Sequence, residues 1–175
     1  MLANIREHSL RVMEVAVFLG EALTDAGFDL YLPLVTVGAL LHDLGKTPCL
    51  GTLTNHAELG AGILEELGYP HLAQVVREHV HLDGNILDPR PLREAEVVNY
   101  ADKRVLHEEV VTLEARFADL MVRYGRTSEA LARIKVTEVR TRALEEKIFA
   151  ALQLSPLDLL RVNGERFSKA YGKSA

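Results

Sequence analysis

Apolar residues recur at the three- and four-residue spacing of an α-helix along almost the whole chain of 175 residues. Ile5, Val12, Leu19 and Leu23, for example, share one face of a helix over 4–26. No run alternates strictly between apolar and polar residues, as a half-buried strand does. This pattern predicts an all-α fold.

Glycines, prolines and capping residues divide the pattern into successive helices. We expect them over about 4–26, 32–44, 55–68, 70–82, 92–124 and 128–152, with a short seventh helix that opens at Ser155-Pro156. The helix over 32–44 is apolar nearly all round, which predicts that it is the central buried helix. A chain of this length is expected to form one domain, with a helical core over 1–125. Residues 126–175 would then be a C-terminal helical extension that serves packing or dimerisation.

Composition and charge exclude several classes of protein. The longest strongly apolar stretch, 30–41, is shorter than the roughly 20 residues of a membrane span, and the first residues lack the basic and apolar pattern of a signal peptide. The single cysteine, Cys49, can form no internal disulfide, which suits a reducing cytoplasm. A net charge of -5 argues against broad binding to nucleic-acid polymers and leaves room for a local basic pocket. We therefore expect a cytoplasmic protein that binds neither membranes nor nucleic-acid polymers.

Histidines and aspartates occupy positions where a helical core should be apolar. His8 lies within the apolar stripe of its helix, and His79 and Asp102 are flanked at helical spacing by valines and leucines. The pair His42-Asp43 closes the most apolar helix of the chain. A buried carboxylate is very costly unless it is protonated, pairs with a cation or binds a metal.

A metal site would satisfy these residues together. A lone histidine on an apolar face is more often a core residue with a hydrogen-bond partner, but several such residues on five helices favour convergence on metal. Five of the seven histidines also fall between positions 42 and 81. The residues fit a two-metal centre, with one ion near His8, His42, Asp43 and Asp102, and a second near His56 and His79, bridged by Asp43.

The ordered motifs resemble those of the HD-domain superfamily of metal-dependent phosphohydrolases. The matching segments are His8, His42-Asp43-Leu44-Gly45-Lys46 (a variant of the HDIG box), His56 and its helix, His79, and Asp102 in Tyr100-Ala101-Asp102-Lys103-Arg104. The resemblance covers roughly residues 4–110 and extends to the two-metal branches. The Gly-Tyr-Pro triplet of the cyclic-dinucleotide phosphodiesterases does not follow Asp83-Gly84, which disfavours that activity.

The resemblance implies that the chain hydrolyses a phosphoester or phosphoanhydride of a nucleotide-type substrate with a metal-activated water. Asp43 would hold metal, and Lys46 would meet a phosphate oxygen, although a lysine there could simply satisfy the helix dipole. The cofactor would be one or two divalent or trivalent ions; iron and manganese are favoured, with zinc, nickel, cobalt and magnesium as alternatives. Arg77, Lys103 and Arg104 could add phosphate contacts or simply be solvated.

Two further functions compete with hydrolysis. One is an HD-fold di-iron oxygenase, and the other is a noncatalytic signalling module that binds a nucleotide. Of the remaining histidines, His71 and His107 are expected at the surface, and a ligand role for His81 is left open. Cys49 is expected to be a packing residue, and a homodimer is compatible with the sequence.

Overall fold

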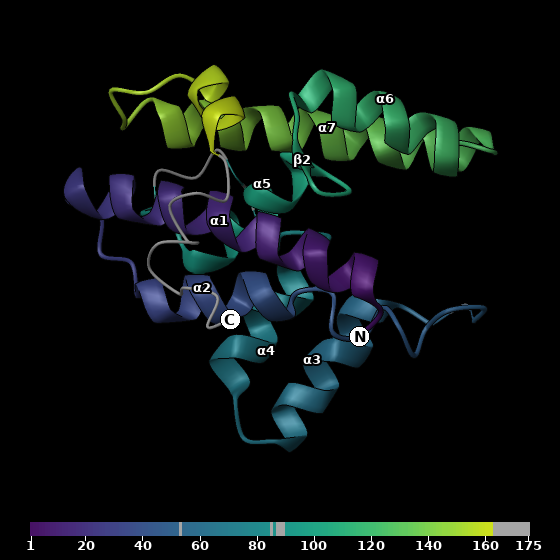
Figure 1. Cartoon of the computed structure of the whole chain (residues 1–175). Coiled ribbons are helices and arrows are strands. Elements are labelled where there is room, and N and C mark those ends of the chain that lie inside the picture. Colours follow the sequence, from purple (N-terminus) through teal and green to yellow (C-terminus); the bar gives the residue numbers. More distant parts are fainter. Residues whose placement is uncertain (53, 85, 87–89, 163–175) are drawn as a thin grey trace, which may run out of the picture.

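A computed structural model describes residues 1–52, 54–84, 86 and 90–162 of the chain and confirms the all-α prediction (Figure 1). The helices are α1 Ala3–Asp25, α2 Leu32–Leu41, α3 His56–Glu66, α4 Pro70–Glu78, α5 Glu94–Lys103, α6 Leu113–Tyr124 and α7 Ser128–Phe149, followed by the 3-10 helix η1 Pro156–Arg161. Two short antiparallel strands, β1 Val105–Leu106 and β2 Glu109–Val110, form a hairpin between α5 and α6.

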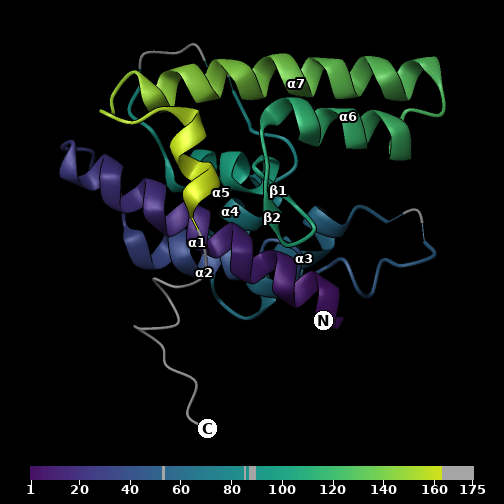
Figure 2. The same ribbon diagram turned by 45° about the horizontal axis from the view of Figure 1, so that its top comes forward.

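The helices are arranged in layers. Helices α6 and α7 lie side by side on top, α1 and α5 lie beneath them, α2 follows, and α3 and α4 project at the far side (Figure 1). A second view shows the same pairing of α6 with α7 (Figure 2). No helix in the described part of the chain is both long enough and apolar enough to cross a membrane.

Helix α5, rather than α2, is the central buried helix. Every residue from Ala95 to Lys103 is buried, and α5 packs on α1, α2, α4 and α7. The prediction for the second helix is wrong: only Val35, Gly38 and Ala39 of α2 are buried, while Val37 is 39% exposed. An apolar composition on all sides therefore did not bring burial on all sides: α2 packs on α1, α4 and α5, and its remaining face, which carries Val37, stays exposed.

The single helix expected over 92–124 is also wrong, because the chain reverses after Lys103. Val105 pairs with Val110 in the hairpin, and His107 between the strands has a positive φ of 56°. β-Branched valines favour such paired strands over a continuing helix. The reversal places α6 back across the molecule, where it pairs with α7. Helices α2 and α4 likewise end three and four residues earlier than expected, at Leu41 and Glu78.

The buried Arg104 side chain holds the hairpin and the C-terminal helices together. Its Nε donates to the carbonyl of Val111, one terminal nitrogen donates to the Tyr100 hydroxyl, and the other donates to the carbonyl of Pro156. Arg104 also forms an ion pair with Glu145 of α7 at 3.3 Å. The guanidinium therefore joins α5, the hairpin, α7 and η1. The last residues of the expected C-terminal extension, 163–175, lie outside the described residues.

We expect Arg104→Ala to lower the free energy of unfolding by about 3–5 kcal/mol. The substitution removes the donor of three hydrogen bonds and leaves Glu145 without its ion-pair partner. Arg142→Ala is the matched control, since Arg142 is 42% exposed and pairs with Glu138 on its own helix; it should cost about 1 kcal/mol or less. Urea denaturation followed by circular dichroism measures both. Equal losses in the two variants would contradict a joining role for Arg104.

Candidate metal centre

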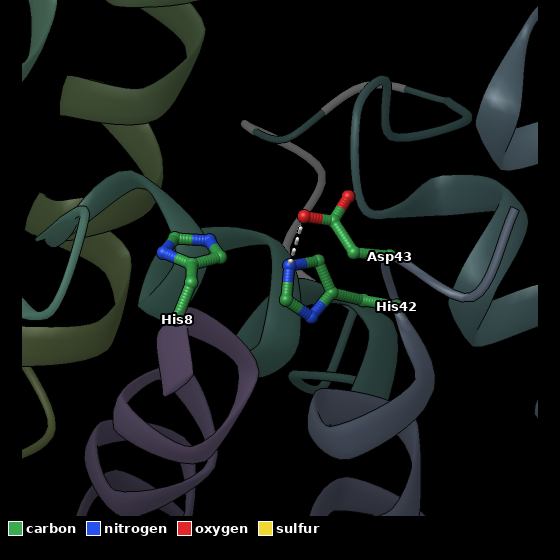
Figure 3. A group of neighbouring side chains, drawn as sticks. All are labelled: His8, His42 and Asp43. Carbon is green, nitrogen blue, oxygen red and sulfur yellow. Dashed lines mark ion pairs between the residues drawn. The ribbon is translucent and has the colours of Figure 1, made fainter. Parts of the chain in front are cut away.

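Asp43 lies at the centre of a cluster of imidazoles. Its Oδ2 is 3.5 Å from Nε2 of His42, and its Oδ1 is 3.4 Å from Nε2 of His56 and 3.6 Å from Nε2 of His79. Figure 3 shows His8 and His42 facing this carboxylate from the first turns of α1 and the end of α2. Two overlapping groups therefore share Asp43: His8, His42 and Asp43 form one, and Asp43, His56 and His79 form the other.

Asp102 of α5 provides a second carboxylate on the side of His8. Its Oδ1 is 3.1 Å from Nε2 of His8 and 3.6 Å from Nε2 of His42. Its Oδ2 accepts a hydrogen bond from Lys103, whose ammonium also donates to the carbonyl of His79. Asp102 is 7% exposed, so this carboxylate is removed from water together with its partners.

The protonation of three imidazoles follows from their hydrogen bonds. Nδ1 of His8, His42 and His79 lies 2.8, 2.7 and 2.5 Å from the backbone carbonyls of His107, Ala39 and Val76, respectively. A carbonyl only accepts, so each Nδ1 carries a proton, and Nε2 of each ring is the atom that faces the carboxylates. Metal-binding histidines commonly show this arrangement, in which the second nitrogen donates to a carbonyl and orients the ring.

The cluster needs a proton or a metal ion between the Nε2 atoms and the carboxylates that they face. Nε2 of the buried His42 has no hydrogen-bond partner among the described residues, and it faces the Asp43 and Asp102 carboxylates. Lone pairs that face carboxylate oxygens repel one another unless a cation lies between them. Imidazole nitrogens and carboxylate oxygens suit a transition-metal ion, so the donor set fits a metal.

The pKa directions agree with a centre that attracts cations. Burial lowers the pKa of His42, but the Asp43 and Asp102 carboxylates and the carbonyl of Ala39 together outweigh burial and raise it. Burial raises the pKa of Asp43, but His42, His79 and Lys46 together outweigh burial and lower it. Burial and the neighbouring His79 lower the pKa of His56 to about 4, so His56 is neutral at pH 7. The field that favours a proton on His42 equally favours a metal ion at the same place.

Gly45 brings His56 within reach of Asp43. A Cβ at position 45 would lie 2.1 Å from the backbone oxygen of His56 and 2.8 Å from the backbone nitrogen of Gly60. The turn after α2 can therefore touch the start of α3 only where residue 45 has no side chain. Asn55 caps α3 by accepting from the backbone nitrogen of Ala57, which fixes the first turn that carries His56.

A cavity of about 500 Å³ opens over the cluster. Asp43, His56, His79 and Asp102 line its floor, and side chains of α6 and α7 line its outer wall. A second hollow of about 400 Å³ reaches His8 and shares Asp43, Lys46, Arg116 and Tyr124 with the first. A larger cavity of about 730 Å³ lies between Phe28, Leu92 and Ala143 and contains none of the histidines. The cavity over the cluster is the candidate site because it combines a suitable size with chemically active groups.

The structure places the expected phosphate contacts unequally. Lys46 donates to Asp43 Oδ2 at 2.8 Å and lines both hollows, and Lys103 also lines the larger of these two. Arg77 instead binds Glu58 and Glu65 and does not line the cavity. The proposed contact by Arg104 is contradicted, because its guanidinium is buried against Val111, Tyr100 and Pro156.

The other histidines and Cys49 separate from the cluster. His71 and His107 are exposed, as expected, although His107 lies in the hairpin rather than on a helix. His81 lines the cavity on its outer side without joining either group of candidate ligands. Cys49 is partly buried in the turn after α2 and lines neither hollow over the cluster.

Several residues of the site were not found from the sequence. Arg116, Phe117, Arg133 and Ile134 line the outer wall of the cavity, although residues after 125 had been assigned only to packing or dimerisation. Asn99 of α5 donates to the carbonyls of Glu78 and His79 and so holds the turn that carries His79. Asn99 lies among apolar residues at helical spacing on α5, and this signal could have indicated it. The wall residues could not be found in this way, because the reversal of the chain after α5 was not predicted.

We expect Asp43→Ala to retain almost no metal, because both groups share its carboxylate, and His56→Ala to retain about half, because only the second group loses a donor. His71→Ala removes an exposed histidine outside the cluster and should keep the full content. Elemental analysis of the purified variants, with circular dichroism to check folding, measures these contents. Full metal content in folded Asp43→Ala protein would refute the assignment of Asp43 as a ligand.

Comparison with known proteins agrees with this geometry. The model of the HD domain family matches residues 5–124, which include every residue of the cluster. An uncharacterized protein of Methanocaldococcus jannaschii, MJ0778, is 29% identical over 144 residues, which cover 75% of this chain and 83% of that protein. No solved structure matches the chain. With its histidines and aspartates gathered on the helices that the family model spans, the chain belongs to the HD-domain family, whose members are generally metal-dependent phosphohydrolases.

Proposed function

We propose that this protein hydrolyses a phosphoester or phosphoanhydride bond of a nucleotide-type substrate, with one or two metal ions held by His8, His42, Asp43, His56, His79 and Asp102. The observation that carries this proposal is the set of imidazole Nε2 atoms that face the two carboxylates beside an open cavity. Iron and manganese are the favoured ions, since mixed nitrogen and oxygen ligands accept both.

Bound ions would provide a hydroxide nucleophile near neutral pH and neutralise charge on phosphoryl oxygens. The protein contributes rigid positions for these groups. The backbone carbonyls of His107, Ala39 and Val76 fix three imidazole rings, and Lys103 fixes Asp102. Such preorganised groups need little rearrangement when charge develops in the transition state.

Lys46 is the candidate contact for the reacting phosphate. Its side chain is 43% exposed, and its ammonium pairs with Asp43 at the border of both hollows. A lysine ammonium has three donors, so Lys46 can keep Asp43 as a partner and still donate to a phosphate oxygen. The same ion pair would hold the Asp43 carboxylate in one orientation.

A screen of phosphoesters and nucleotides with the metal-loaded protein tests the proposed function. We expect release of phosphate or of a nucleoside monophosphate from at least one compound, and loss of that turnover in Asp43→Ala. The metal content of the same preparation is measured first. Consumption of oxygen without turnover of any phosphoester would favour the di-iron oxygenase, and nucleotide binding without either reaction would favour a noncatalytic module.

We expect Lys46→Ala to keep its metal and to raise KM by about tenfold, because one charge-assisted hydrogen bond to phosphate is lost. Steady-state kinetics on the substrate found in the screen, together with metal analysis, separate binding from metal loss. Unchanged kinetics would restrict Lys46 to its ion pair with Asp43.

A further inference from the structure

The cavity over the cluster has the opposite charge balance to the whole chain. The chain contains 20 lysines and arginines against 25 aspartates and glutamates. The described cavity lining contains four cationic side chains, Lys46, Lys103, Arg116 and Arg133, against two acidic ones, Asp43 and Asp102. A cavity with this excess of positive charge attracts anions, although the negative net charge of the whole chain repels them elsewhere.

The four cations fall into two sets. On the floor, Lys46 and Lys103 are paired with Asp43 and Asp102 at 2.8 and 2.7 Å. On the outer wall, α6 contributes Arg116 and α7 contributes Arg133, and neither helix adds an acidic residue to the described lining. The floor is therefore close to neutral before metal binds, and the excess positive charge lies on the wall.

The two wall arginines have unused hydrogen-bond donors. Nε of Arg116 is buried and has no hydrogen-bond partner among the described residues, and its ion pair with Asp119 spans 3.7 Å. The Arg133 side chain forms no hydrogen bond or ion pair with another described residue; its backbone carbonyl accepts a hydrogen bond from the Thr137 hydroxyl. Arginine presents five donors in a planar fork that matches phosphate, so unused arginine donors over a cavity suit a phosphate group.

His81 lines the cavity and also a neighbouring small hollow, which Arg140 lines as well. Arg140 donates to the carbonyls of Leu82 and Gly84, so its charge is held next to His81. An anion near His81 would therefore meet Arg140 in addition to the cations of the cavity.

We propose that Arg133 and Arg116 hold a second phosphate group of the substrate, so that the substrate is a phosphoanhydride chain rather than a monophosphate. The inference rests on the proposed function, which puts the reacting phosphate at Asp43 and Lys46. The helical pair α6–α7 then selects the substrate by its number of phosphates. Arg116 lies within the 5–124 match to the HD domain and Arg133 lies beyond it, so this selection would combine the domain with the helix that follows it.

Isothermal titration with inorganic phosphate, diphosphate and triphosphate tests this inference on the metal-loaded protein. We expect triphosphate to bind at least tenfold more tightly than phosphate, because only the longer anion reaches the wall as well as the floor. Arg133→Ala should remove about tenfold of the triphosphate affinity and leave phosphate binding unchanged, as expected for one charge-assisted contact. Arg133→Lys should lie between, since it keeps the charge and loses the fork.

Lys135→Ala is the matched control, because it removes one positive charge from an exposed position of α7 outside the cavity lining. Its triphosphate affinity should equal that of the unaltered protein. The metal content is measured after each titration, since polyphosphates also bind free metal. Equal binding of phosphate and triphosphate, or equal losses in Arg133→Ala and Lys135→Ala, would overturn the inference.

Phosphate release is followed in the same samples, so binding and turnover are judged separately. Triphosphate binding that depends on Arg133 without hydrolysis of any phosphoester would sustain the anion site and refute the proposed function. Hydrolysis of monophosphates with no effect of Arg133→Ala on triphosphate binding would sustain the function and refute the second phosphate site.

Discussion

The structure depends on keeping two carboxylates and several imidazoles together in a buried cluster. Asp43 and Asp102 are 2% and 7% exposed, and a buried carboxylate without compensation costs several kcal/mol. Lys46 and Lys103 each offset part of one charge, and the imidazole Nε2 atoms that face the carboxylates offset more only if a proton or a metal lies between them. The folded chain is therefore stabilised when a cation binds in the cluster. The residues that surround this position come from helices that are far apart in the sequence.

Helix α5, the most buried helix, contributes both to the packing of the core and to the candidate metal site. Asp102 reaches the cluster from this helix, Asn99 and Lys103 hold the turn around His79, and Arg104 at its end secures α7. A helix buried on every side has little freedom to move, so ligands mounted on it keep their geometry without help from the metal. The same helix thus links the position of the candidate ligands to the position of the outer wall of the cavity.

The sequence predicted much of the cluster because buried polar residues stand out against apolar helical periodicity. His8, His79 and Asp102 were recognised by this contrast, and the structure brings them together with His42, Asp43 and His56. Periodicity failed where the helical pattern continued across a break. Residues 104–112 contain no glycine or proline to mark a turn, and a histidine takes the positive φ instead. The buried state of Arg104 was equally invisible, because its partners at Tyr100, Val111 and Pro156 come together only after the chain reverses.

The error over this break also hid the position of the last two helices beside the cavity. A straight helix over 92–124 would carry the following segment away from the cluster, and its weak apolar face would then suggest only packing. The hairpin instead returns α6 and α7 over the cavity, where Arg116 and Arg133 add positive charge above a floor that is nearly neutral before metal binds. Metal on the floor would attract any phosphate, whereas charge on the wall would distinguish a longer anion from a shorter one. On the proposed function, the core would supply the chemistry, and selection among phosphorylated compounds would depend on α6 and α7.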